Sequence, residues 1–152
     1  FEKAASGECV IREVAARHRS PPAMLRELAG ALYERFLEPD DVALVRMVIA
    51  RSIDDVDFAR RFFETTAMHT RKALEDVFVE WADAGVAMAG PPEVLSEIFL
   101  GLIISDLQND AISHGVMARP GAERIAERTE FFLRGAGLDD ARENPGRAET
   151  PA

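Results

Sequence analysis

One stretch decides the fold of this chain: Ile98-Phe99-Leu100-Gly101-Leu102-Ile103-Ile104. Its residues are apolar almost all the way round when they are placed on a helix at 100° per residue. A helix that is apolar on every side must be covered on every side, by its own chain or by a partner. The stretch therefore predicts a helix from Pro92 to about Gly115 that is covered over most of its surface.

The same helix changes chemistry halfway along one face. That face starts with the apolar residues Leu95, Ile98, Phe99 and Leu102. It continues with the polar residues Asp106, Asn109 and Ser113. Because a buried carboxylate needs a partner, we expect Asp106 to meet an arginine, a second copy of the chain or a ligand.

The rest of the chain also has the periodicity of helices, and no segment is typical of a strand. Pro, Gly, Ser and Asp breaks delimit five further predicted helices, at residues 2–17, 21–37, 42–51, 56–84 and 122–134. Only Arg46 interrupts the apolar segment 42–51, so we expect that helix near the centre of the domain. The sequence therefore predicts an all-α, antiparallel bundle of about six helices.

Composition sets the broad class of the protein. The 152 residues are 47% hydrophobic and 30% charged, which is typical of one globular domain. The net charge of −9 argues against nucleic-acid binding by this chain alone. The single cysteine, Cys9, fits a reducing compartment. No apolar run approaches the roughly 20 residues of a membrane span, and there is no signal peptide. We therefore expect a cytoplasmic protein without a membrane partner.

Catalytic and metal-binding patterns are weak. The best constellation is Asp106, Asp110 and His114, spaced four residues apart along one helix as metal ligands can be. The same pattern arises where the end of a helix becomes exposed to solvent. The helix dipole favours a histidine near the C-terminus of a helix. We expect no metal, no cofactor and no catalytic residue; a small helical enzyme that uses Asp106 and His114 remains an alternative.

A second polar cluster lies on the long predicted helix, 56–84. Thr66 and Thr70 are one turn apart on its apolar stripe, and His69 lies beside them. Their hydroxyl groups either bond back to backbone carbonyls one turn earlier or orient a ligand in a mostly apolar pocket. The sequence leaves both interpretations open.

Three motifs, in this order and spacing, carry a resemblance to a known family. They are Phe58-Ala59-Arg60-Arg61-Phe62-Phe63-Glu64, then Ile98 to Ile103 leading into Asp106-Leu107, then Phe131-Phe132-Leu133-Arg134-Gly135-Ala136-Gly137. Together they resemble the C-terminal half of TetR/AcrR-type transcriptional regulators, with an AefR-like C-terminal domain the nearest in character. The resemblance covers about residues 22–137.

The resemblance implies a homodimeric repressor that a small lipophilic ligand releases from operator DNA. It implies an effector-binding and dimerisation domain over residues 1–137, with 1–18 as the linker helix from an N-terminal helix-turn-helix domain that this chain lacks. Operator DNA would then be bound only through that missing domain. Residues 138–152 are expected to be a flexible polar tail. A helical adaptor that binds another protein through Ile98–Ile104 remains an alternative.

Candidate site residues follow from this interpretation. The ligand is expected between the second to fifth helices, at Tyr33, Phe36, Met47, Phe62, Thr66, His69, Thr70, Phe99, Ile103 and Asp106. The dimer interface is expected on the last two helices, at Leu100, Ile104, Leu107, Ala111, Ile125, Thr129, Phe132 and Leu133.

Overall fold

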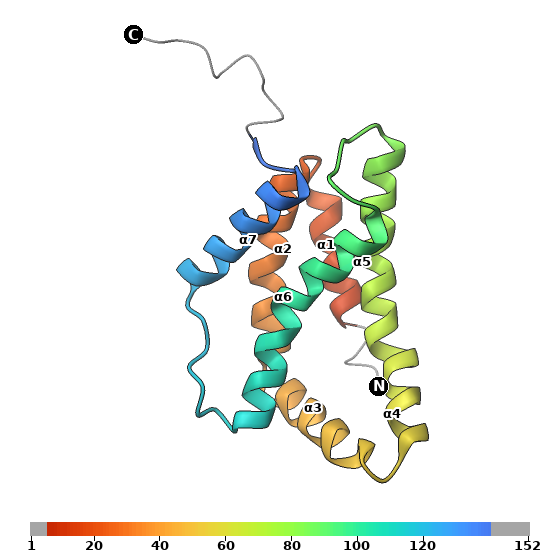
Figure 1. Ribbon diagram of the computed structural model, residues 1–152, viewed down its shortest axis with the longest axis vertical. Helices are drawn as coiled ribbons and strands as arrows, with labels where there is room; N and C mark the ends of the chain where they lie inside the picture. The colour runs from red at the N-terminus through yellow and green to blue at the C-terminus, as the bar shows by residue number, and fades with distance from the viewer. Residues whose placement is uncertain (1–5, 141–152) are drawn as a thin grey trace.

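The computed structural model describes residues 6–140 and is helical, with no strand among those residues. In chain order the elements are α1 (Ser6–Arg17), α2 (Pro21–Phe36), α3 (Pro39–Ser52), α4 (Val56–Phe62), the π-helical segment η2 (Phe63–Ala67), α5 (Met68–Asp83), α6 (Pro92–Ser113) and α7 (Ala122–Ala136). Because α4, η2 and α5 follow one another without a break, they are the long helix expected over 56–84. The predicted all-α bundle of about six helices is confirmed (Figure 1).

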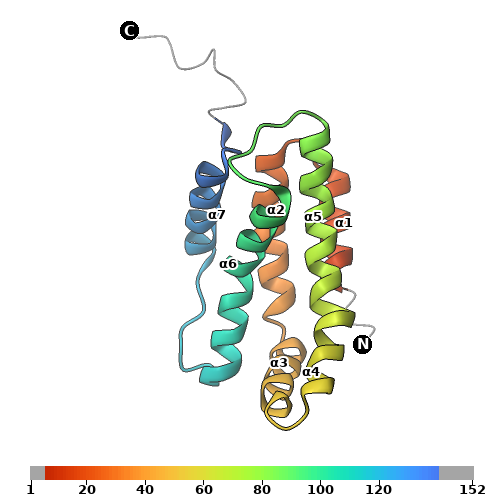
Figure 2. The same ribbon diagram turned by 45° about the vertical axis from the view of Figure 1, so that its right-hand side comes forward.

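Helix α6 is covered by its own chain. It packs on α5, α3, α2 and α7, while α1 lies against both α2 and α5. Figures 1 and 2 show α1, α2 and α5 running side by side, with α6 and α7 on one flank and α3 and α4 at one end of the bundle. Most of the cover that Ile98–Ile104 requires is therefore supplied by α2, α5 and α7.

Local sequence explains where several helices start and stop. Proline occupies the first turn of α2, α3 and α6, where its missing N–H costs no hydrogen bond. The side chain of Asp55 caps α4 by accepting from the backbone N–H of Phe58. Helix α6 is followed directly by His114, whose φ of 53° is left-handed, and α7 by Gly137, with φ of 72°.

The main core joins α1, α2, α5, α6 and α7. Its centre is an aromatic cluster in which the Phe132 ring meets Phe99 edge-on at 5.2 Å and Phe78 at 6.4 Å between centroids. A second, smaller cluster of Val42, Leu107 and Ala111 joins α3 to the end of α6.

Helix α3 is not central, contrary to expectation. Only Val42 and Val48 are buried in it, while Met47 and Ile49 are 44% and 37% exposed. The reason is that α3 packs only on the end of α6 and on the short helix α4, and no other described helix contacts it to a comparable extent.

The buried face of α6 is rotated from the predicted one. Ile98 is 49% exposed, whereas Leu100 and Ile103 are buried. The carboxylate that continues the buried face is Asp110, and Asp106 lies half-buried at its border. The surface proposed for an adaptor, Ile98–Ile104, is therefore largely taken up by the chain's own core.

Packing continues past the boundary predicted at Gly137. Leu138 is 3% exposed and donates its backbone N–H to the carbonyl of Leu133 at 2.8 Å. Asp140 forms an ion pair with Arg26. The remainder of the expected tail, 141–152, and the start of the expected linker helix, 1–5, lie outside the described residues. Within residues 6–140, no helix combines the length and the apolar character needed to cross a membrane.

Candidate ligand-binding and regulatory site

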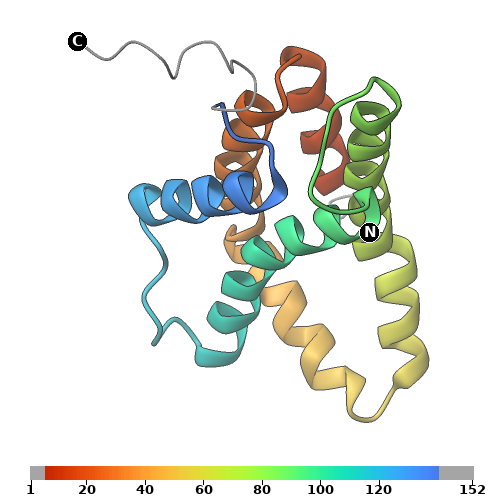
Figure 3. The ribbon, with the colours of Figure 1, turned by 45° about the horizontal axis from the view of Figure 1, so that its top comes forward.

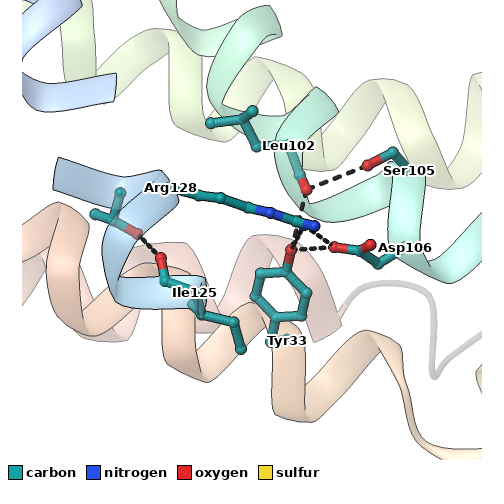
Figure 4. A network of polar contacts seen from close by, with 7 residues as sticks. Tyr33, Leu102, Ser105, Asp106, Ile125 and Arg128 are labelled. Atoms are coloured by element: carbon teal, nitrogen blue, oxygen red, sulfur yellow. Dashed lines mark hydrogen bonds and ion pairs between the residues drawn. The ribbon is translucent and has the colours of Figure 1, made fainter. Parts of the chain in front are cut away.

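A polar network ties three helices together around Asp106. The phenol of Tyr33 on α2 and the guanidinium of Arg128 on α7 both donate to the same Asp106 oxygen on α6. Arg128 also donates to the Tyr33 oxygen at 2.9 Å, and the carbonyl of Leu102 lies 3.0 Å from that oxygen (Figure 4). Of the three partners that the sequence allowed for Asp106, the structure shows an arginine, together with a tyrosine.

The network perturbs the titration of its members. Burial, followed by the hydrogen bond to Asp106, raises the pKa of Tyr33 to about 12. Burial acts to lower the pKa of Arg128, but the hydrogen bond to Asp106 and the charges nearby leave the pKa raised overall. The phenol is therefore neutral and the guanidinium charged at neutral pH.

A second acid–base pair lies one turn further along α6. Asp110 is 5% exposed and accepts a hydrogen bond from Arg119, which belongs to the connection between α6 and α7. Asp106, Asp110 and Arg119 border a cavity of about 20 Å³, which is the size of one water molecule. His114 is exposed at the end of the helix, and no group of three metal-ligating side chains occurs among residues 6–140.

Helices α1, α2 and α5 meet closely at Gly7. A Cβ atom at Gly7 would lie 2.6 Å from Oγ1 of Thr70 and 3.3 Å from the ring of Phe36. Only glycine allows α1 to approach α5 this closely. Two side chains expected to contact the ligand, Phe36 and Thr70, are therefore in direct contact with α1.

The long helix changes its winding just before Thr70. Over η2 the backbone is π-helical, and the N–H of Met68 donates to the carbonyl of Phe63, five residues earlier. Thr65 donates its hydroxyl to the carbonyl of Arg61 at 2.6 Å, and Thr66 donates to that of Phe62. The back-bonding that the sequence offered as one interpretation is thus present at Thr66.

The structure distributes the ten expected ligand-contacting residues over distinct places. Phe36 and Thr70 lie against Gly7 of α1, while Phe62 and Thr66 share a hydrogen bond at η2; Thr66 and Thr70 are buried and the two phenylalanines half-buried. Tyr33 and Asp106 belong to the network with Arg128. Phe99 and Ile103 are buried in the main core, and Met47 and His69 are exposed. Phe36 and Thr70 thus bring an apolar and a polar side chain together next to α1.

The expected dimer residues also divide by burial. Within the chain's own core lie Leu100, Leu107, Ala111, Thr129, Phe132 and Leu133. Ile104 and Ile125 are half-buried. On the same two helices the exposed large apolar side chains are Val94, Ile98, Ile112 and Phe131, at 45%, 49%, 65% and 73% exposure. These side chains remain accessible to a partner.

Sequence reasoning missed two residues of importance. Arg128 lies between Ile125 and Phe132 on the face of α7 that points toward the core. Because arginine is rarely buried without a partner, its position on that face indicates an acidic partner. Gly7 carried no signal, because a close approach between helices depends on how they are placed relative to one another.

The family match agrees with this architecture. Residues 23–134 match the family described as "AefR-like transcriptional repressor, C-terminal domain". The match covers most of the chain and includes most of α2, all of α3 to α6 and most of α7.

The chain belongs to this family. Its fold is that of a TetR-type C-terminal regulatory domain. One similar crystal structure is that of a proposed TetR-family transcriptional regulator from Mesorhizobium loti, with a TM-score of 0.75 and 20% sequence identity. The similarity covers 89% of this chain and 68% of that chain. No curated protein sequence matches this one.

Proposed function

We propose that this AefR-like domain senses a small lipophilic ligand and dimerises, as the regulatory part of a cytoplasmic transcriptional repressor. Operator DNA is contacted by a separate segment of the protein that precedes α1. Ligand binding then changes the position of α1 and, with it, DNA binding. A ligand has this effect only if its affinity differs between the two positions of α1.

The observation that carries the proposal is the contact of Gly7 with Thr70 and Phe36. At this point α1 touches Phe36 and Thr70. We group these two residues with Phe62 and Thr66 as the proposed ligand-contacting residues. A ligand that separates α2 from α5 therefore displaces α1 as well, because a close-packed contact transmits displacement.

The chemistry of this group favours an uncharged, mostly apolar ligand. Phe36 and Phe62 are half-buried and supply apolar surface, while Thr66 and Thr70 supply hydroxyl oxygens. The hydroxyl hydrogen of Thr66 is already donated to Phe62, so its oxygen is available chiefly as an acceptor. A ligand with one donor group on an apolar skeleton suits these side chains.

The test is thermal unfolding in the presence of 1-naphthol, which has an apolar ring system and one hydroxyl donor. We expect 1-naphthol to raise the unfolding midpoint by several degrees. We expect Thr66→Leu, which replaces the hydroxyl with a larger apolar side chain, to abolish the increase. Thr129→Leu is the matched control, because Thr129 is also buried and back-bonded but lies on α7. An equal increase in both variants would place the binding site elsewhere.

The proposed dimer uses the exposed apolar side chains of α6 and α7, with Phe131 the largest. We expect Phe131→Glu to convert a dimer to a monomer in sedimentation experiments, because a buried charge without a partner is costly. Ile53→Glu is the control: Ile53 is 81% exposed but lies between α3 and α4. A monomeric wild-type protein, or loss of the dimer in the control alone, would contradict this interface.

A further inference from the structure

The chain between the end of α6 and the middle of α7 contains no buried residue. This connecting segment runs from His114 to Arg128, and the buried residues of α7 begin only at Thr129. Figures 1 and 3 show the connection between α6 and α7 at the edge of the molecule. Within the segment, Ile125 is half-buried against the main core. Apolar burial therefore contributes little to holding the connecting segment in one position.

Two arginines of the connecting segment reach back to carboxylates of α6. Arg119 donates to Asp110, and Arg128 donates to Asp106, one turn earlier on α6. Helix α7 itself packs mainly on α2 and only slightly on α6. The position of the segment relative to α6 therefore depends on these ion pairs more than on helix packing.

The backbone just after α6 directs the segment toward Asp110. His114 and Gly115 are both left-handed, with φ of 53° and 79°, so the chain reverses there. A Cβ atom at Gly115 would lie 3.9 Å from Oδ1 of Asp110. The N–H of Met117 then donates to the hydroxyl of Ser113 at 3.3 Å. This turn brings the following residues back over the last two turns of α6.

Asp110 itself belongs to a part of α6 that is held from its other side by α3. Arg46 donates to the carbonyl of the next residue, Ala111, at 3.0 Å. Val42 packs with Leu107 and Ala111 in the second core cluster. Asp110 is thus fixed in place, and the connecting segment is the partner that can move away from it.

The two members of the Asp110–Arg119 pair differ strongly in exposure. The side chain of Arg119 is 50% exposed, whereas that of Asp110 is 7% exposed. When the pair separates, the guanidinium is readily hydrated, but the carboxylate stays buried without its partner, which is costly. A second carboxylate, Asp106, borders the same cavity of about 20 Å³ and adds to that cost by repulsion.

From these observations we propose that Asp110 and Arg119 form a latch that fixes the connecting segment, and with it the start of α7, against the end of α6. In the closed form both charges are paired. In the open form the connecting segment is free to move, while the second half of α7 stays in the core. The latch is a property of the single chain and needs neither a ligand nor a second copy.

Hydrogen exchange of the intact protein tests the latch. We expect Arg119→Gln to make the amides of residues 114–124 exchange about tenfold faster, with those of α2 and α5 unchanged. Arg124→Gln is the matched control, because it removes an exposed arginine from the same connecting segment. Equal exchange of residues 114–124 in the two variants would overturn the proposal.

Combining Arg119→Gln with Asp110→Asn tests the burial of the charge. We expect Arg119→Gln alone to lower the urea midpoint, and Asp110→Asn in the same chain to recover about half of that loss, because no charge is then left buried. Additive losses would overturn the latch. If Arg119→Gln alone does not fold, a folded double variant demonstrates the same coupling, and an unfolded one contradicts it.

The latch also has a consequence for the dimer, and this part rests on the proposed function. The connecting segment joins the faces of α6 and α7 that carry Ile112 and Phe131, so the latch sets how these faces are placed. We expect Arg119→Gln to weaken the dimer at least fivefold in sedimentation experiments. An unweakened dimer would contradict this consequence. A monomeric wild-type protein would contradict the proposed dimer, whereas hydrogen exchange would still decide the latch.

Discussion

Tyr33 and Asp106, which are 73 positions apart in the sequence, share a hydrogen bond in which the phenol of α2 donates to the carboxylate of α6. Arg128 of α7 completes this contact by donating to both. Three helices thus meet at one carboxylate oxygen. The relative position of α2, α6 and α7 depends on all three side chains, because removing one leaves the other two incompletely satisfied.

The titration of Tyr33 follows directly from this contact. Tyr33 is the single tyrosine of the 152 residues, so absorbance near 295 nm reports it alone in this chain. We expect a midpoint at about pH 12 in the folded chain and near pH 10 in urea. A midpoint near pH 10 in the folded chain would contradict burial beside Asp106.

The same raised pKa predicts how stability depends on alkaline pH. Because the folded-state pKa exceeds the unfolded one, the contribution is fully present below about pH 10 and is lost as the pH rises through about 12. The loss amounts to roughly 2 kcal/mol. Urea unfolding followed by fluorescence of Trp81 measures it, and Tyr33→Phe should remove the loss over this range.

Replacing Asp106 by asparagine tests the carboxylate itself. We expect Asp106→Asn to lower the free energy of unfolding by about 1–3 kcal/mol, because charged hydrogen bonds to Tyr33 and Arg128 are weakened. Asp57→Asn is the control, since its pair with Arg60 is exposed on both sides and such pairs contribute little. Similar losses in both variants would show that the network adds nothing beyond a surface ion pair.

A methyl group at Gly7 tests the crossing of α1 and α5. Gly7→Ala places a Cβ 2.6 Å from Thr70, so we expect a loss of about 1–3 kcal/mol from overpacking. Thr70→Ala in the same chain removes the atoms that clash and restores part of the loss. Gly30→Ala, which meets nothing within 4 Å in α2, should instead stabilise by up to about 1 kcal/mol. An unchanged or higher stability of Gly7→Ala would mean that α1 is not held at this distance.

Leu138 offers a test of the packing beyond α7. Although the sequence around it is polar, its side chain is 3% exposed in the main core. We expect Leu138→Ala to lower the free energy of unfolding by about 2–4 kcal/mol in urea titrations. A change below about 0.5 kcal/mol, the usual size for surface substitutions, would place Leu138 outside the core.

The sequence predicted most helices, because apolar periodicity and proline or glycine breaks act locally. It placed α6 at Pro92–Gly115, and the structure ends it two residues earlier at Ser113. The same local reasoning failed for α3, which is apolar but lies at one end of the bundle. Periodicity shows that a face needs cover and does not show whether a neighbour is there to cover it.

For the candidate site, the sequence singled out Asp106, Thr66 and Thr70 as polar residues on apolar faces. It could not select Arg128 as the partner of Asp106, because the two meet only when α7 packs on α6. Nor could it show that Asp110 is the more deeply buried carboxylate, since the rotation of α6 depends on its packing against α5, α3 and α2 at once.

The amino-acid sequence by itself determined that this chain is helical, where its helices break and which family it resembles, since these depend on residues near one another along the chain. The tertiary structure decided which apolar side chains stay exposed on α3 and α4, which arginine meets which aspartate, and how closely α1 approaches α5. The physical reason is that burial, ion pairing and steric contact are set by distances between helices. Those distances follow from the packing of all the helices at once.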